Sequence, residues 1–277
     1  MQIVQINTPR LDRLSAILDD VAPVFSVMGP TESWSEVNEH GSKLQTQPSL
    51  VIAINPSIAL EKSANQQATS RPPILWIGHL MHWTEMMAAQ GSGLSELICL
   101  RARLTGPLGP LMMEEFVLPT VLCTNVDESA LSSPLNLIQQ EIENPRCGQQ
   151  ALLKSAGDIL FVGILRNLVA YPNPNRPGLL KALSDARIAK ALVAMHQAPQ
   201  LDWDLYKLAL QAGMSRTSFA TIFKKTMNKS PGKYLVALRL ALARRAIQSG
   251  KTIKEAARIS GYRTPGSIAR ALKSLAA

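Results

Sequence analysis

Apolar and polar residues follow two different patterns along the chain. Up to about residue 123, short apolar runs are separated by segments rich in Pro, Gly and Ser, which is typical of strands in a barrel or sandwich. These runs are Leu50–Ile54, Ile74–Ile77, Ser95–Leu104 and Phe116–Cys123. Beyond them, two stretches with helical spacing lead to a C-terminal part that is helical throughout. The pattern predicts an α+β domain followed by an all-α domain.

The C-terminal part contains the same pattern of residues twice, 48 positions apart. Ala209 and Gly213 in the first copy correspond to Ala257 and Gly261 in the second. A small residue lets a second helix cross closely over the first, and glycine adopts the positive φ that ends a helix. Leu205–Lys225 and Ile253–Lys273 are therefore predicted to be two helix-turn-helix motifs.

Capping residues place the helices of this part. Ile188, Leu192 and Met195 share one face of its first helix, and Asp202 is the predicted N-cap of the next. A long helix starts with Ser230 as N-cap and Pro231 as first residue, and ends before Ser249-Gly250; Thr264 and Pro265 play the same two roles in the second motif. At about 1.5 Å per residue, the long helix can hold the two motifs one turn of DNA apart.

Three prolines and a glycine within Tyr171–Gly178 cannot continue a helix or join a sheet, so they indicate a linker. The predicted organisation is a first domain over residues 1–171, a linker over 172–182 and a second domain over 183–277.

Charge separates the same two parts. Residues 181–277 hold 18 Lys and Arg against 4 Asp and Glu, whereas residues 1–180 hold 11 against 16. A module with a net charge of +14 suits the neutralisation of DNA phosphates, although the charge could also serve solubility alone. The most apolar stretch, Ile159–Leu165, is far shorter than a membrane span, so we expect no membrane association and a cytoplasmic protein.

The helical part resembles the AraC/XylS family of bacterial transcription regulators. The resemblance covers about residues 183–277 and rests on Ala209, Gly213, Met214, Ser215, Phe219, Phe223, Ser230, Pro231, Tyr234, Ala257, Gly261, Tyr262 and Arg270 to Lys273. It implies that the second helix of each motif enters the major groove, in two successive turns of double-stranded DNA. Ile268 and Leu272 replace aromatic residues of the family, and Pro265-Gly266 replaces better helix formers, so the second motif is expected to be less stable or less discriminating.

The resemblance also implies which residues contact DNA. They are Ser215, Arg216, Thr217, Ala220, Thr221, Lys224 and Lys225 in the first motif, and Arg263, Thr264, Pro265, Gly266, Ser267, Arg270 and Lys273 in the second. Among the positions at which the resemblance implies contact with bases, only Arg216 and Arg270 can bind guanine through two hydrogen bonds, although Arg216 also suits a phosphate contact. Lys224, Lys225, Lys229, Lys233, Arg263 and Lys273 suit phosphate contact or plain solvation equally.

The first domain resembles the cupin-type ligand-binding domain of one branch of that family. Leu97–Leu111 and Gln149–Arg166 carry the resemblance. No His-x-His occurs, and His79 and His82 would point to opposite faces of a strand, so no metal or cofactor is expected. His40 beside Glu36 and Glu39 reads as a polar loop, and no catalytic residue is expected. Trp34, Trp76 and Trp83 could line an apolar pocket or pack elsewhere, and Cys99, Cys123 and Cys147 are expected to be reduced.

The helix predicted at Gln149 to Val169 is apolar over more than half its circumference. Because one face is too small to bury it, we expect a homodimer through positions such as Leu153, Ile164 and Leu168. Three functions stay open. The leading one is a DNA-binding regulator that senses a ligand, with RNA polymerase as the partner of an activator; the others are a cupin-type enzyme with a DNA-binding tail and a regulator controlled by another protein.

Overall fold

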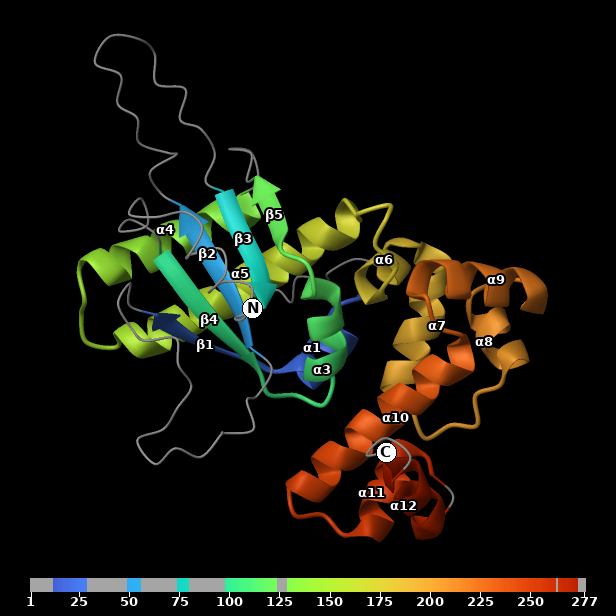
Figure 1. The fold of residues 1–277 in the computed structure, drawn as a ribbon. Coiled ribbons are helices and arrows are strands. Elements are labelled where there is room, and N and C mark those ends of the chain that lie inside the picture. The colour runs from blue at the N-terminus through green and yellow to red at the C-terminus, as the bar shows by residue number, and fades with distance from the viewer. Residues whose placement is uncertain are drawn as a thin grey trace, which may run out of the picture. The chain divides into compact units, whose positions relative to one another are not determined.

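A computed structural model describes residues 12–28, 49–55, 74–79, 98–123, 129–262 and 264–273 (Figure 1). The chain forms two compact units. The first, called the sheet unit here, is Val21–Asn167, and the second, called the helical unit, combines Met1–Asp20 with Leu168–Ala277.

The sheet unit is built on five antiparallel strands in the order β1-β4-β2-β3-β5. They are β1 (Pro23–Met28), β2 (Ser49–Asn55), β3 (Ile74–His79), β4 (Ile98–Leu104) and β5 (Thr120–Cys123). The predicted antiparallel β region is confirmed, while its closure into a barrel stays a prediction.

One of the four predicted strands is partly wrong. The run Phe116–Cys123 divides into a 3-10 turn, η3 (Glu114–Phe116), which follows α3 (Gly109–Met113), and the short strand β5. The side chain of Phe116, the last residue of this turn, is buried, and Pro119 has no N–H to donate to a neighbouring strand. The strand therefore begins only at Thr120.

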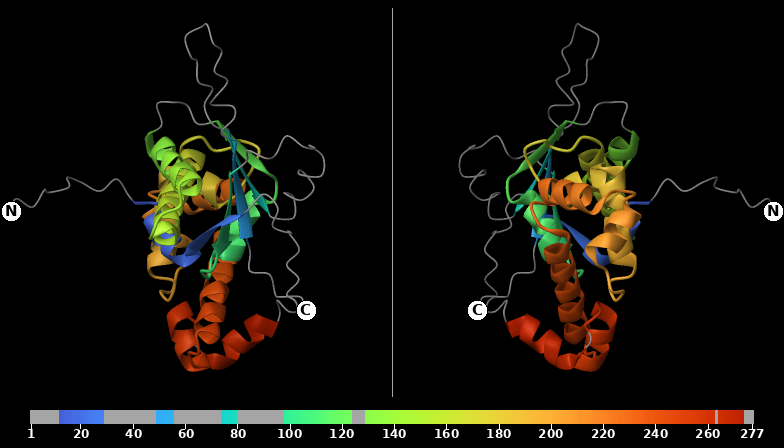
Figure 2. Two further views of the ribbon diagram at one scale, coloured as in Figure 1. Left: turned by 90° about the vertical axis from the view of Figure 1, so that its left-hand side faces the viewer. Right: turned by 90° about the vertical axis from the view of Figure 1, so that its right-hand side faces the viewer.

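Two helices, α4 (Ser129–Glu143) and α5 (Gln149–Ala170), lie on one side of the sheet, as the edge-on view in Figure 2 shows. Phe161 of α5 meets Phe25 of β1 edge to face, with ring centroids 6.0 Å apart. Gly157 permits this approach, because a Cβ built there would lie 2.5 Å from Cγ of Phe25. The buried face of the sheet, which includes Ile52 and Leu100, forms the core beneath them.

The helical unit contains two helix pairs of the same construction, α8/α9 and α11/α12, with the long helix α10 between them in the chain. Its helices after α5 are α6 (Leu179–Ser184), α7 (Ala186–Gln197), α8 (Leu205–Gln211), α9 (Arg216–Met227), α10 (Pro231–Gln248), α11 (Ile253–Ser260) and α12 (Pro265–Lys273). The predicted caps Ser230 and Thr264 start α10 and α12, since their Oγ atoms accept from Lys233 N and Ser267 N.

Two boundaries differ from the predicted ones. Asp204, not Asp202, is the N-cap of α8, and its carboxylate accepts from Lys207 N at 2.7 Å. The helix α6 lies largely within the range predicted as linker, because Leu179, Leu180 and Leu183 are buried in the helical unit.

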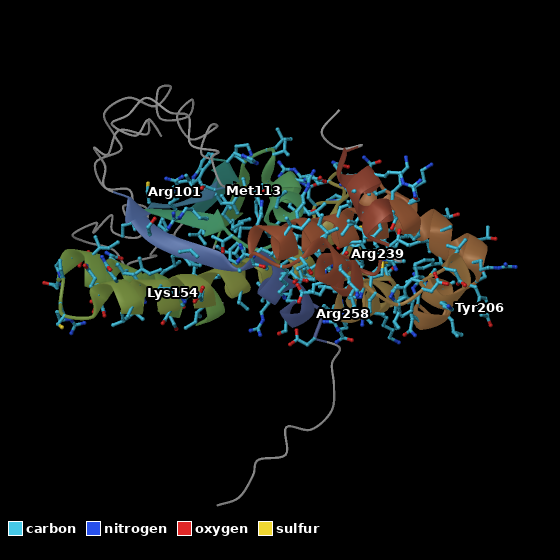
Figure 3. All side chains as sticks on the ribbon, turned by 90° about the horizontal axis from the view of Figure 1, so that it is seen from below. Arg101, Met113, Lys154, Tyr206, Arg239 and Arg258 are labelled. Atoms are coloured by element: carbon cyan, nitrogen blue, oxygen red, sulfur yellow. The ribbon has the colours of Figure 1, made fainter. Side chains whose placement is uncertain are left out.

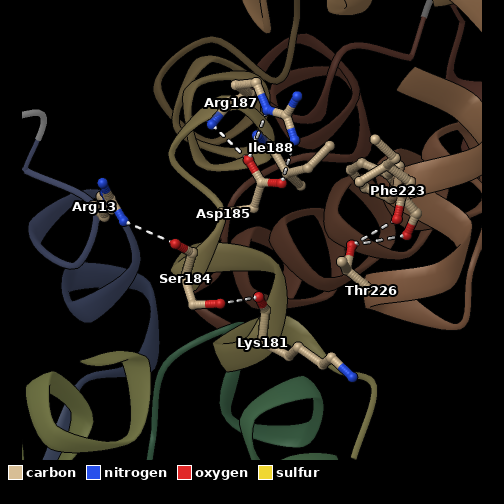
Figure 4. A network of polar contacts seen from close by, with 9 residues as sticks. Arg13, Lys181, Ser184, Asp185, Arg187, Ile188, Phe223 and Thr226 are labelled. Carbon is tan, nitrogen blue, oxygen red and sulfur yellow. Dashed lines mark hydrogen bonds and ion pairs between the residues drawn. The ribbon is translucent and has the colours of Figure 1, made fainter. Parts of the chain in front are cut away.

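A helix from the start of the chain, α1 (Ser15–Val21), also belongs almost wholly to the helical unit. Just before it, Arg13 donates to the carbonyl oxygens of Leu183 and Ser184, at 3.0 and 3.4 Å, and Figure 4 shows the contact with Ser184. The carboxylate of Asp20 lies 3.6 Å from Nδ1 of buried His196, whose Nε2 is 2.7 Å from the Tyr234 hydroxyl. These contacts link the start of the chain to α6 and α7, and through His196 to α10.

Candidate nucleic-acid interface

The turn between α8 and α9 is fixed by its backbone. Gly213 has a φ of +63°, which ends α8, and Met214 N donates to the carbonyl oxygen of Ala209 at 2.9 Å. Ser215 then caps α9, because its Oγ accepts from Ser218 N at 3.2 Å. Ala209 is buried where the two helices pack, as its small size predicts.

One face of α9 is held in the core. Phe219, Phe223 and Met227 are buried, and the ring of Phe223 lies 5.5 Å from that of Phe219 and 6.1 Å from that of Tyr234 on α10. The other face points to solvent, and its exposed side chains are Arg216, Thr217, Ser218, Thr221, Lys224 and Lys225, with Ala220 half-buried. A rigid helix therefore presents cations and small polar groups outward.

The second pair repeats this plan with fewer polar groups. Thr264 caps α12, and Ile268 anchors the helix in a core with Ala243, Ala246, Ala256 and Ala257. Gly266 and Arg270 are exposed on α12, together with Ala269, and Ser267 is half-buried. Arg270 is thus the one long side chain among the described side chains of α12 that reaches solvent, and its Nε lies 3.4 Å from the Gly266 carbonyl oxygen.

The structure gathers the predicted DNA-contacting residues into two groups. Ser215, Arg216, Thr217, Ala220, Thr221, Lys224 and Lys225 lie on α9 or at its start, and Thr264, Gly266, Ser267 and Arg270 lie on α12 or at its start. Arg263 lies outside the described residues, as do the side chains of Pro265 and Lys273. Ser215, Thr264 and Ser267 also hold their own helix ends, because their hydroxyls take part in the caps.

Two features were not predicted from the sequence: the exposed position of Ser218 on α9 and the cap at the start of α11. Ser218 is exposed on the first turn of α9 beside Arg216, so helical spacing alone could have found it. Thr252 and Glu255 form a capping box at the start of α11, a pattern that Thr-x-x-Glu indicates in the sequence.

Hydrogen bonds from Thr252 lower the pKa of the Glu255 carboxyl, and a hydrogen bond from Arg187 lowers the pKa of the Asp185 carboxyl.

The candidates in the first domain are covered only in part. His79 and Trp76 are half-buried on β3, whereas His40, His82, Trp34, Trp83 and the two glutamates beside His40 lie outside the described residues. The described part of the chain brings no three His, Cys, Asp or Glu side chains together in a way that could hold a metal ion. Burial raises the pKa of the Cys99 thiol to about 11, so this thiol is protonated at neutral pH, while Cys147 is exposed.

None of the helices described here combines the length and the apolar character needed to cross a membrane.

Comparison with known proteins assigns both regions. Residues 208–277 match the family described as helix-turn-helix domain, and residues 40–170 match the cupin family. An uncharacterized HTH-type transcriptional regulator of Haemophilus influenzae is 30% identical over 158 residues, covering 57% of this chain and 53% of that protein. A putative AraC-like transcription regulator of Streptomyces lividans and the HTH-type transcriptional regulator AlkR of Acinetobacter baylyi are each 29% identical over 140 residues, which is 50% of this chain and 46% and 45% of theirs.

The matched part of the chain spans about half the length of these relatives. Their descriptions as helix-turn-helix or AraC-like regulators agree with the resemblance of residues 183–277, and the cupin match agrees with the antiparallel sheet region.

Proposed function

We propose that this chain, which matches a helix-turn-helix family behind a cupin family and is similar to an AraC-like regulator, is itself a sequence-specific, DNA-binding transcription regulator and not an enzyme. It acts in the bacterial cytoplasm, where α9 and α12 read two successive major grooves of one duplex. The observation that carries this proposal is the outward face of α9, which joins Arg216, Lys224 and Lys225 to small polar groups on a helix anchored by Phe219 and Phe223.

The composition of the two outward faces assigns them different roles. A guanidinium binds guanine through two hydrogen bonds, and threonine hydroxyls suit base edges and phosphates alike, so α9 is the more discriminating of the two helices. On α12, Gly266 and Ala269 offer no polar side chain, which leaves direct readout to Arg270. The fully buried neighbours of Ile268 in the second pair are alanines, and Ile247, Ile259 and Tyr262 pack against them only partly buried, whereas the first pair buries two phenylalanines completely.

Selection of bound sequences from a random duplex pool tests the proposal directly. We expect an enriched site with two conserved segments about one helical turn apart. Enrichment of no sequence would contradict it.

On the selected site, replacing Arg216 by alanine should weaken binding by about 1 to 3 kcal/mol and relax one base position. Arg270→Ala should act about one helical turn away, with a smaller loss. Fluorescence anisotropy against sites mutated at single positions measures both effects. Arg187→Ala is the matched control, since Arg187 also carries one charge but is paired with Asp185 at 3.0 Å (Figure 4). Losses at neighbouring bases would contradict reading by two separate helices.

The proposed regulator is a homodimer, although the structure narrows the surface that could form it. Four of the large apolar side chains of α5, those of Leu160, Phe161, Ile164 and Leu165, are buried in the structure. Ile164 is therefore a core residue and not a suitable dimer position, whereas Ile159 is 56% exposed on the same helix.

Placing a charge at Ile159 should separate the subunits without unfolding them. We expect Ile159→Glu to shift the mass toward the monomer in sedimentation, because a carboxylate would be buried at the interface. Gln150→Glu adds the same charge at an exposed position half a turn round the helix, and should leave the mass unchanged. A dimer that survives Ile159→Glu is built on another surface.

The signal that the first domain receives is proposed to be a small molecule, on the strength of the cupin match. The alternative signal is another protein that binds the first domain. In either case, RNA polymerase is the proposed partner if the regulator is an activator. Thermal stability measured against metabolites and against proteins separates these two signals, because a ligand that binds only the folded state raises the melting temperature.

A further inference from the structure

Arg239 lies in the middle of α10 (Figure 3) and points its donors at the loop between α7 and α8. Its Nε donates to the carbonyl oxygen of Pro199 at 2.8 Å, and Nη2 donates to that of Leu201 at 2.7 Å. Partial burial lowers the pKa of this guanidinium, which nevertheless stays charged at neutral pH. Two short hydrogen bonds from one charged, planar group hold a loop in both distance and direction.

This loop, residues 198–204, is itself ordered and leads straight into the first helix pair. Leu201 N and Trp203 Nε1 both donate to the Ala198 carbonyl oxygen, at 3.1 and 2.8 Å. Asp204 at its end caps α8, which packs against α9. A displacement of the loop therefore carries the first pair with it.

The second helix pair touches the same loop from its own side. Gly261 ends α11 with a φ of +76°, and a Cβ at this position would lie 2.6 Å from Gln200 Cα and 2.7 Å from the Pro199 carbonyl oxygen. The next residue, Tyr262, has a buried hydroxyl with no hydrogen-bond partner among the described residues, and burial raises its pKa while the nearby charge of Arg239 opposes that rise. Backbone thus packs on backbone, with Arg239 at the edge of the contact.

We propose that Arg239, Gly261 and the loop at residues 198–204 form a junction that sets the separation and angle of α9 and α12. Both helix pairs contact α10, so this helix alone would keep them in one unit. Without the junction, however, the loop at residues 198–204 would not be held against the end of α11. This inference rests on the proposed function, and it assigns Arg239 and Gly261 the role of positioning residues. They fix how far apart two DNA segments must lie, although neither residue reads a base.

The arrangement of the two pairs can be measured without DNA. Spin labels attached through non-natural residues at Ser218 on α9 and Ala269 on α12, both exposed, report their distance in the full chain. We expect one narrow distribution for the unmodified protein and a shifted or wider one for Arg239→Met, which keeps an unbranched side chain but removes the donors. Arg244→Met removes an exposed charge from the same helix and should leave the distribution unchanged.

Gly261→Ala tests the other side of the junction independently. Its matched control is Gly250→Ala, because Gly250 has a similar φ of +83° but open space around its Cβ position, so only the backbone strain is shared. We expect the distance to change for Gly261→Ala and not for Gly250→Ala. Circular dichroism checks the helix content, and Arg239→Lys replaces any Arg239 variant that loses it. Distributions that overlay the unmodified protein for both Arg239→Met and Gly261→Ala would overturn the proposal.

Binding to spaced sites then connects the junction to DNA. We expect one base pair inserted between the two segments to weaken binding of the unmodified protein about tenfold, comparable to a mismatched base pair. Arg239→Met should reduce that penalty to about twofold while lowering affinity for the unspaced site. A changed distance with no change in the spacing penalty would contradict reading by two helices and leave the junction standing.

Discussion

Raising the salt concentration from 50 to 200 mM should weaken DNA binding about a thousandfold. The physical reason is counterion release: with roughly six phosphate contacts, log K falls against log salt with a slope of about −5. We expect these contacts to come from the cations exposed on α9 and at the start of α10, among them Lys224, Lys225 and Lys233. Anisotropy titrations at several salt concentrations give the slope.

Removing two of these cations should reduce the slope in a predictable way. We expect Lys224→Gln combined with Lys225→Gln to lower its magnitude by about 1.8, because each phosphate that is no longer neutralised accounts for about 0.9. Lys190→Gln removes an exposed charge from α7 and serves as the control. A slope near zero for the unmodified protein would show that phosphate neutralisation does not drive binding.

Replacing Phe223 by alanine should destabilise the first helix pair by about 3 to 5 kcal/mol. The side chain is completely buried between Phe219 and Tyr234, so its removal leaves a cavity that the surrounding helices cannot fill without moving. Hydrogen exchange in peptides that cover α9 measures the change locally, because the full chain contains two units that need not unfold together.

Tyr206→Ala is the matched control for that measurement. Tyr206 also carries an aromatic ring, yet its side chain stands on the outer surface of α8 and is 61% exposed (Figure 3), so its loss should change stability by no more than about 0.5 kcal/mol. Equal exchange rates for the two variants would mean that the packing of Phe223 does not hold α9.

The helices of the second domain could be predicted from the sequence because their determinants are local. Ser215 and Ser230 cap helices wherever their neighbours permit, Pro231 suits only the first turn, and Gly213 takes a φ that other residues avoid. The choice between Asp202 and Asp204 could not be made from residue type, because aspartate is a suitable cap at either position. The turn before α8, in which Trp203 Nε1 donates to the Ala198 carbonyl oxygen, is not encoded by a spacing rule.

The sheet unit was harder to predict because its determinants are distant in the sequence. Periodicity showed that α5 is apolar around much of its surface, but it could not tell which side the sheet would take, so Ile164, expected at a dimer surface, is buried in the core, while Ile159 is exposed. Arg239 likewise looks like one more cation in a basic domain. Its partners are the backbone carbonyls of Pro199 and Leu201, about forty residues earlier in the chain. Because every residue carries a carbonyl, the sequence does not indicate which ones Arg239 binds.

The position of α1 in the sequence affects the order in which the two units can complete their folding. Arg13 leaves the ribosome about 170 residues ahead of the Leu183 carbonyl that it binds, which is roughly 10 to 30 s at ordinary rates of protein synthesis. During that interval the strands from β1 to β5 have already emerged and can pair, while α1 still lacks α6 and α7. The helical unit can therefore reach its final form only after the whole sheet unit has been synthesised, however quickly its own helices form.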